Sequence, residues 1–219
     1  MKNILLLTDS LGYPRMSVGS PSASNVWTYR LARKLKGKYN FFFDIKTGRT
    51  TSEIVDNLLP HFAAYQAEVI IIQVGIVDCY PRALSKIELQ VISRIPILNS
   101  FFKMLIKKYY KEIINLRKIN YVDEGTFENN IRDIKSFFCN SQVIFLPIAP
   151  PNKKYCNINP LVELNISKYN SILSKVVGEQ CDVSFFDDLD AEKAYVSDNH
   201  HFSDYGHAYT YKKLLGDLA

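Results

Sequence analysis

Three residues with the chemistry of an activated serine lie far apart in the sequence. Ser10 follows directly after Thr8 and Asp9, while Asp198 and His201 stand three residues apart near the other end. A serine hydroxyl is a weak nucleophile until a histidine removes its proton, and a carboxylate can fix the tautomer of that histidine. The three residues therefore predict a catalytic triad in the order Ser, Asp, His, if the fold brings them together.

The elements around these residues can be inferred from the apolar pattern. The run Ile4–Leu7 indicates a short buried strand, and Gly12 and Pro14 end it. Ser10 is therefore expected in the turn at the carboxyl end of this strand, where open α/β sheets build their sites. Asp198 and His201 lie in a polar segment in which a single turn would place the carboxylate beside the imidazole.

Five short apolar or β-branched runs alternate with longer segments of helical spacing. This alternation predicts an α/β fold, a three-layer α/β/α flavodoxin-like sandwich with a five-stranded parallel sheet. Helices are expected over residues 24–35, 52–64, 126–138, 162–177 and 205–218. The five expected strands are Ile4–Leu7, Phe41–Ile45, Val69–Val74, Val143–Ile148 and Val183–Phe186.

The segment after the third strand is too long for one crossover helix. We expect a helical insertion over about residues 83–121, made of two helices because Pro96 must break or kink it. Residues 79–121 hold nine Lys or Arg and two Asp or Glu, a net charge of +7 that leaves the other residues slightly acidic. Aromatic and aliphatic residues interleave with these lysines, which fits a lid, a dimer face or a basic surface on an anionic membrane. Packing on its own domain with snorkelling lysines is the simpler alternative.

Length and composition limit the class of protein. A chain of 219 residues with 47% hydrophobic content fits one α/β domain, so residues 1–219 are taken as a single domain. The first apolar run is too short for a signal peptide or a membrane span, so a cytoplasmic location without a transmembrane segment is expected. Four scattered cysteines indicate reduced thiols, and no spacing of metal ligands appears. We expect no cofactor. We also expect no nucleic-acid partner, because no recognisable nucleic-acid-binding motif accompanies the basic cluster.

Four blocks in order resemble the motifs of the SGNH/GDSL hydrolase superfamily, and together they extend over nearly the whole chain. The resemblance implies a serine esterase in which Ser10 is the nucleophile and Asp198 and His201 complete the triad. It also implies that the backbone N–H groups of Ser10 and Gly48 form the oxyanion hole. The four blocks are Thr8-Asp9-Ser10-Leu11-Gly12, with Thr8 in place of the family's first glycine, Thr47-Gly48-Arg49-Thr50-Thr51, Gly75-Ile76-Val77-Asp78 and Asp198-Asn199-His200-His201.

The third block departs from the family pattern. Val77 stands where the family has an asparagine that donates to the oxyanion, and an apolar side chain cannot donate. Loss of one such donor in a hydrolase typically costs about 10²–10³ in rate. The sequence offers three candidates for a replacement donor, Arg82, Asn25 and Asn152.

Other polar residues near the blocks are candidates for substrate binding. They are Arg82, Asp78, Asn25 and His200, although Asp78 is also well suited to organise its own loop through backbone N–H groups. His200 is adjacent to His201, so an alignment of the last block shifted by one residue would exchange them. The family's Asp-x-x-His spacing selects His201 for the triad.

The resemblance implies an O-acylated carbohydrate, in particular an O-acetylated one, as the substrate. The chain would then be an acyl ester hydrolase on a small-molecule or glycan ester. An O-acyltransferase acting on surface-polysaccharide sugars is the alternative, because the insert is long enough to shield an acyl-enzyme from water. A non-catalytic fold that binds a glycan or a protein partner is a further alternative, favoured by Val77 and opposed by the intact triad. A phosphate-binding flavodoxin-like domain is disfavoured, since no glycine-rich phosphate loop is present. The basic insert also leaves peripheral membrane contact open.

Overall fold

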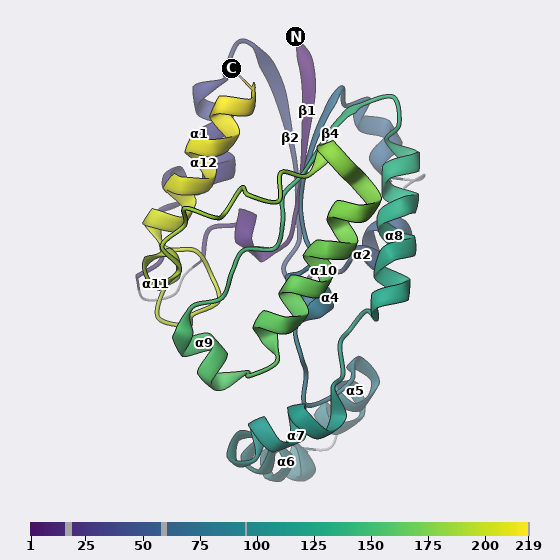
Figure 1. Cartoon of the computed structure of the whole chain (residues 1–219), viewed down its shortest axis with the longest axis vertical. Coiled ribbons are helices and arrows are strands. Elements are labelled where there is room, and N and C mark those ends of the chain that lie inside the picture. The colour runs from purple at the N-terminus through teal and green to yellow at the C-terminus, as the bar shows by residue number, and fades with distance from the viewer. Residues whose placement is uncertain (16–18, 58–60, 95, 219) are drawn as a thin grey trace.

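Four parallel strands form one sheet in the order β2-β1-β3-β4 in the computed structural model (Figure 1). The structure describes residues 1–15, 19–57, 61–94 and 96–218, with only the backbone for 96–99 and 101. The central strand β1 pairs with a neighbour on each side, so that Leu6 lies opposite both Phe43 and Ile71. The strands are β1 (Lys2–Thr8), β2 (Tyr39–Ile45), β3 (Val69–Gln73) and β4 (Gln142–Phe145).

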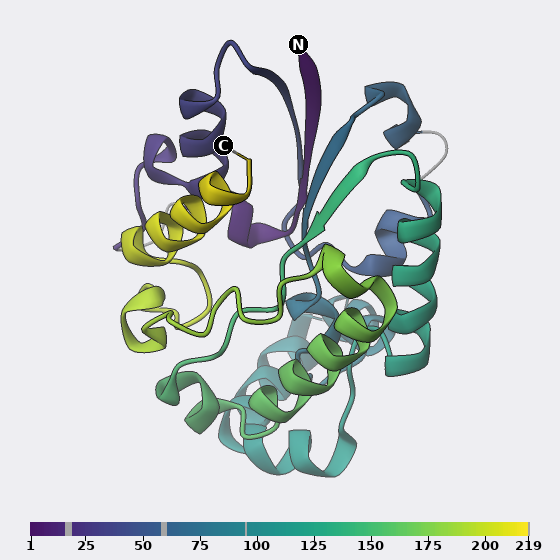
Figure 2. The same cartoon turned by 45° about the horizontal axis from the view of Figure 1, so that its top comes forward.

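Helices cover both faces of this sheet (Figures 1 and 2). On one face α1 (Trp27–Lys34) packs against α12 (Asp204–Leu218). On the other face α8 (Glu124–Phe137) packs between α2 (Thr51–Val55) and α10 (Val162–Val177). Residues 4–7 of β1 and 69–72 of β3 are buried, as expected for parallel strands covered on both sides.

Short helices occupy the connections at the sheet's edges. They are η1 (Ser10–Gly12), η2 (Ala23–Asn25), η3 (Phe62–Tyr65), α4 (Ile76–Cys79), α9 (Lys153–Ile158), η4 (Gly178–Gln180) and α11 (Ala191–Ala194). Two of them, η1 and α4, follow β1 and β3 directly.

The expected fifth strand, Val183–Phe186, is not a strand. These residues form consecutive turns, because the carboxylate of Asp182 accepts both the N–H and the hydroxyl of Ser184, and Phe185 N–H donates to the carbonyl of Asp182. Such a local side-chain bond competes with strand pairing. The described part of the sheet therefore has four strands, and Phe185 and Phe186 enter the core from a turn.

The insertion after the third strand contains three helices rather than two. They are α5 (Lys86–Ser93), α6 (Pro96–Lys108) and α7 (Tyr110–Arg117), and they form the lower end of the molecule in Figure 1. Pro96 is the first residue of α6, a position where the missing N–H costs nothing. No helix in the described ranges is long and apolar enough to cross a membrane.

Gly75 lies between β3 and α4, where the backbone conformation and the close packing favour glycine. Its φ is +114°, and an added Cβ would lie 2.8 Å from Cδ1 of Ile148. Gly75→Ala is therefore expected to destabilise the protein by about 1–3 kcal/mol in urea unfolding. Gly216→Ala in α12 is the matched control, since a Cβ there meets nothing within 4 Å and alanine favours a helix. Equal stability of the two variants would show that this junction carries no strain.

Candidate active site

Ser10 lies at the carboxyl end of β1, as the sequence predicts. The strand ends at Thr8, and the carboxylate of Asp9 caps η1 by accepting the N–H of Leu11 at 2.8 Å. Asp9 is itself fixed by its N–H, which donates to the carbonyl of Gln73 on β3 at 3.0 Å. The hydroxyl of Ser10 is thus placed by the sheet and not by a flexible loop, and the residue is 6% exposed.

A tight turn before α12 presents the other two residues. Tyr195 and Phe202 form an isolated bridge, and Val196 N–H donates to the carbonyl of His201 at 2.9 Å. Asn199 has a positive φ of 57°, a conformation that asparagine tolerates better than most residues. The turn brings the Asp198 carboxylate back over the N–H groups of His200 and His201, both at 2.9 Å.

The three residues form one hydrogen-bonded chain. His201 Nε2 lies 3.1 Å from Ser10 Oγ, and His201 Nδ1 lies 2.8 Å from Asp198 Oδ2. The imidazole is therefore fixed from both sides, with its Nδ1 directed to a carboxylate and its Nε2 to the hydroxyl. This is the arrangement that general-base activation of a serine requires.

The electrostatics of the chain favour a neutral imidazole. Burial lowers the pKa of His201, and the bond from Asp198, which raises it, offsets burial only in part. Burial pushes the pKa of Asp198 upward, but hydrogen bonds from the N–H and ring of His201 and from the N–H of His200 outweigh this effect and lower it. His201 is thus available as a base at neutral pH, while Asp198 stays ionised.

His200 lies beside the triad and not within it. Its Nδ1 is 2.7 Å from the hydroxyl of Tyr155, and its ring contacts those of Tyr80 and His201. Burial, followed by the charge of His201, lowers its pKa to about 4, so the ring is neutral. Together with Leu11 and Asn199, His200 lines a cavity of about 10 Å³ whose walls are mostly apolar.

Asp78 is completely buried and anchors the loop after β2. Its Oδ1 accepts the N–H of Thr51 at 2.8 Å and the hydroxyl of Thr51 at 2.6 Å. Asn130 on α8 donates to the same hydroxyl oxygen at 2.9 Å. Asp78 therefore organises the loop that contains Thr51, and its side chain has no exposed surface. The sequence made it a candidate both for substrate binding and for organising its own loop.

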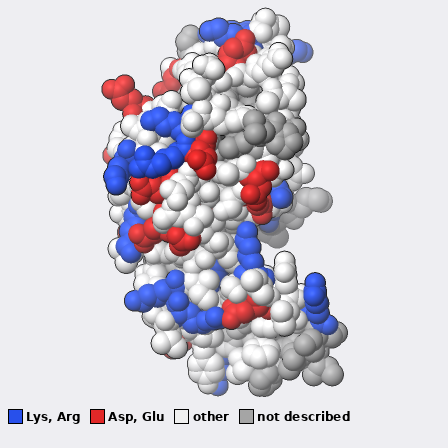
Figure 3. All heavy atoms as spheres, turned by 90° about the vertical axis from the view of Figure 1, so that its right-hand side faces the viewer, with Lys and Arg blue, Asp and Glu red and all other residues white. Residues whose placement is uncertain are grey.

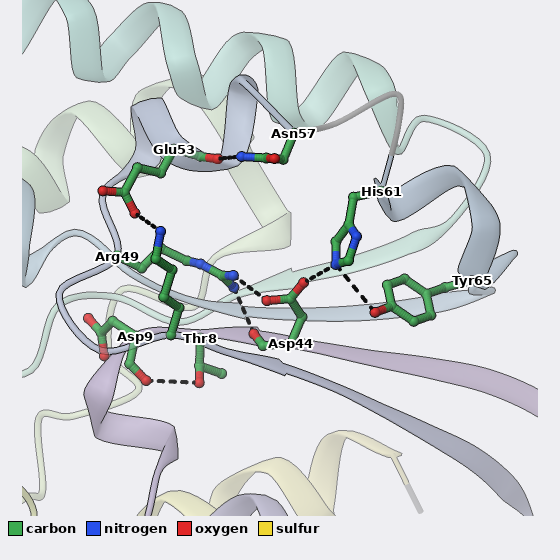
Figure 4. Close-up of polar contacts among 9 residues, drawn as sticks. Thr8, Asp9, Asp44, Arg49, Glu53, Asn57, His61 and Tyr65 are labelled. Carbon is green, nitrogen blue, oxygen red and sulfur yellow. Dashed lines mark hydrogen bonds and ion pairs between the residues drawn. The ribbon is translucent and has the colours of Figure 1, made fainter.

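Gly48 lies in a turn, and the next residue, Arg49, belongs to a second polar network (Figure 4). The φ of Gly48, +71°, is one that glycine adopts freely, and no Cβ contact would arise there. Arg49 is buried and forms an ion pair with Asp44, whose other carboxylate oxygen lies 2.8 Å from His61 Nε2. The Gly48 turn is thus fixed on one side by Arg49 and on the other by Thr51.

The three candidates for the missing oxyanion donor, Arg82, Asn25 and Asn152, lie in different surroundings. Val77 is buried in α4, and Asn152 is occupied, since its amide oxygen caps α9 and its nitrogen donates to Asn199 at 3.2 Å. The guanidinium of Arg82 lies over the rings of Tyr80 and Tyr121, toward the insert. Asn25 is half-buried in η2, and no hydrogen bond joins its side chain to Ser10 within the described ranges.

Several residues of the site were not identified from the sequence. Tyr155 comes from α9, far from the four blocks, and no spacing relates it to His200. Thr51 donates to Asp78 and Asn130 donates to Thr51, and only Thr51 lies inside a block. The charge of Arg15 helps to lower the pKa of both His200 and His201, and its place five residues after Ser10 is the signal that could have identified it.

Metal ligands do not gather near this site. No cluster of three or more His, Cys, Asp or Glu side chains suited to a metal occurs in the part of the chain that the structure describes. The four cysteines are free, with Cys79 and Cys181 buried.

Comparison with known proteins gives a clear result for structure and none for sequence. No protein-family model matches the chain. No curated protein matches it either. Among solved structures, it is similar over 100% of its length to a lipase/acylhydrolase from Enterococcus faecalis, with 14% identity, a TM-score of 0.68 and 95% of that chain covered.

Two further solved structures resemble it to a similar degree. One is an acetyl xylan esterase from Geobacillus stearothermophilus, with 13% identity, a TM-score of 0.67, and 100% of this chain and 94% of that chain covered. The other is the psychrotrophic esterase EstA from Pseudoalteromonas sp., inhibited by monoethylphosphonate, with 15% identity, a TM-score of 0.62, and coverage of 100% and 97%. The chain has the SGNH/GDSL hydrolase fold.

Proposed function

We propose that this chain is a serine-dependent ester hydrolase acting on O-acylated, chiefly O-acetylated, carbohydrate. The observation that carries the proposal is the hydrogen-bonded chain from Ser10 through His201 to Asp198. It joins residues from opposite ends of the sequence at the carboxyl edge of a parallel sheet, where such folds build their sites. The similarity in fold to lipases and esterases supports the same reaction class.

The proposed reaction has two steps. His201 Nε2 takes the proton from Ser10 Oγ as this oxygen attacks the ester carbonyl, and the same proton passes to the leaving alcohol when the carbon–oxygen bond breaks. Water then attacks the acyl-serine with His201 as base, which releases the acid and restores the serine hydroxyl. Asp198 stays ionised and stabilises the imidazolium in both steps.

The oxyanion would be stabilised by backbone N–H groups. No acceptor is recorded for the N–H of Ser10 or of Gly48 among the described residues, so both N–H groups remain available to a ligand. The oxyanion would then have two donors, because the side chain of Val77 cannot supply a third. Removal of one donor typically costs about 10²–10³ in rate, so we expect a slower hydrolase than one with a complete hole.

The cavity beside the triad supports a short acyl group. A cavity of about 10 Å³ on this scale has room for about one water-sized group. The walls contributed by Leu11, Ile76 and Ile148 are apolar, which suits a methyl group better than a polar one. Acetyl is the acyl group that meets both conditions, and two of the similar structures are acetyl xylan esterases.

Covalent labelling tests the nucleophile directly. A small activated phosphonate should add once to the wild-type protein and not to Ser10→Ala, as measured by intact-protein mass spectrometry. Ser171→Ala, an exposed serine on α10, is the control and should label like wild type. The proposal fails if folded wild-type protein does not label, or if the adduct persists in Ser10→Ala.

The pH dependence tests the base. Since burial lowers the pKa of His201, kcat/KM for an activated acetate ester should fall only below the usual histidine value near 6.5 as the imidazole becomes protonated. Asp198→Asn should reduce kcat by about 10⁴ and move this acid limb to still lower pH, because the carboxylate that raises the pKa is lost. An acid limb above pH 6.5 in the wild type would contradict the assignment of the base.

The anchoring of the Gly48 loop gives a separate prediction. Thr51→Val removes the hydroxyl that donates to Asp78, leaving buried polar atoms with fewer partners. We expect kcat to fall about tenfold, or about 1.4 kcal/mol, with KM unchanged, because the loop would hold its N–H less firmly. Thr126→Val removes a similar bond to Asp123 on the exposed surface of α8 and should leave kinetics unchanged. Full activity in Thr51→Val would place the Gly48 loop outside the reaction.

A further inference from the structure

A groove in the helical insert lies apart from the triad. It encloses about 330 Å³, within the range of about 300–1,000 Å³ typical of small-ligand pockets. Residues from α5, α6, α7 and the segments on either side of the insert form its walls. The apolar members are Ala83, Leu84, Leu89, Ile92, Phe102, Ile106, Tyr110 and Tyr121, and the basic members are Arg82, Lys103 and Lys107.

The insert leaves most of its apolar side chains near the surface. Of the side chains described between residues 84 and 121, only that of Ile114 is buried. Leu89 in the groove wall is 47% exposed, and Ile87 and Met104 on the same helices are 73% and 60% exposed. Exposed apolar side chains gathered in this way mark a surface that a ligand or partner covers.

The cations of the groove have no anionic partner in the part of the chain that the structure describes. No ion pair is recorded for Arg82, Lys103 or Lys107 among the described residues. Arg82 Nε is buried without a hydrogen-bond acceptor, and its guanidinium lies 4.4 Å and 4.6 Å from the ring centres of Tyr80 and Tyr121. In the lower part of Figure 3, where the insert lies, Lys and Arg outweigh Asp and Glu among the charged residues in view.

The carboxylate on α5 does not neutralise this charge. Glu88 is bound by Arg117 on α7 at 2.6 Å, and it also caps α5 by accepting the N–H of Ser85. These bonds lower the pKa of Glu88 to about 2, with the bond from Arg117 as the largest cause. Glu88 is therefore committed to joining α5 and α7, and the groove keeps a net positive charge.

We propose that this groove binds a single apolar chain that carries a phosphate group. The chain would lie against Leu89, Ile92 and Phe102, and the phosphate would be bound by Arg82 and the two lysines. Three cations suit a dianion better than a carboxylate, and a guanidinium pairs with two phosphate oxygens at once. The apolar walls exclude a free inorganic anion as the natural occupant.

A row of aromatic rings links the groove to the surroundings of the triad. Tyr110 donates its hydroxyl to that of Tyr80 at 3.2 Å, and Tyr80 stacks on Tyr155 with ring centres 5.3 Å apart. Tyr155 in turn lies 2.7 Å from His200. A ligand in the groove would thus lie next to the side chains that border the triad, yet its binding requires no reaction at Ser10.

Calorimetry with the full chain carrying Ser10→Ala tests this site. The probe is dodecyl phosphate below its micelle concentration, compared with dodecanoate and dodecyl maltoside. We expect one site per chain, with dodecyl phosphate binding at least tenfold more tightly than either comparator. The double substitution Lys103→Gln and Lys107→Gln should weaken dodecyl phosphate at least tenfold. The pair Lys108→Gln and Lys111→Gln makes the same change in charge on residues outside the groove wall and should bind normally.

Four results would overturn the proposal. They are absence of binding by folded protein, equal binding of dodecyl maltoside, equal loss in both lysine pairs, and binding only to vesicles of anionic lipid. The last two would indicate adsorption through charge alone. Because the assay uses Ser10→Ala, failure of the groove leaves the hydrolase proposal standing. Failure of Ser10 labelling, conversely, leaves the groove standing.

Discussion

The parallel pairing of β1 with both β2 and β3 is the constraint on which the site depends. Parallel strands end at the same edge, so this pairing brings together the loops that follow residues 8, 45 and 73. Those three loops carry Ser10, Gly48 and Val77. The fourth participant is the turn with Asp198 and His201, which its own bridge closes. It meets the same edge where His201 Nε2 lies 3.1 Å from Ser10 Oγ.

Two buried carboxyl groups beneath this edge affect the stability of the folded protein. Burial raises the pKa of Asp9 to about 7 and that of Asp78 to about 6, despite bonds from Leu11 and Thr51 that act in the other direction. A raised pKa in the folded state means that the folded protein binds more protons than the unfolded chain between about pH 4 and 7. These two groups therefore lower stability as pH rises through that window, and the depressed pKa values of His200 and His207 oppose the trend.

The sequence predicted those features that follow from local pattern. The bounds of α10 and the place of Ser10 after β1 agree with it, because continuous apolar runs and helical spacing are local signals. Val183–Phe186 was misassigned because the same apolar pattern fits a strand or a buried turn, and the Asp182 side chain decided between them. The sequence indicated that Asp78 could organise its own loop through backbone N–H groups. The loop that it organises is a different one, because its partner Thr51 lies 27 residues away and only the folded chain joins them.

Side chains at the triad are hydrogen-bonded, and those of Ser10 and His201 are buried, whereas those of the insert are largely exposed. This difference fits the two proposed functions, ester hydrolysis at the triad and ligand binding in the insert. Proton transfer and oxyanion stabilisation need atoms fixed within a fraction of an ångström, and the triad and the Gly48 loop are tied to the sheet by buried hydrogen bonds. Selection of an amphiphilic ligand tolerates looser packing, because apolar contact is not directional. A groove that binds the proposed ligand can therefore vary in preference without disturbing Ser10, His201 and Asp198, because its residues lie in or beside the insert and not in the hydrogen-bonded chain.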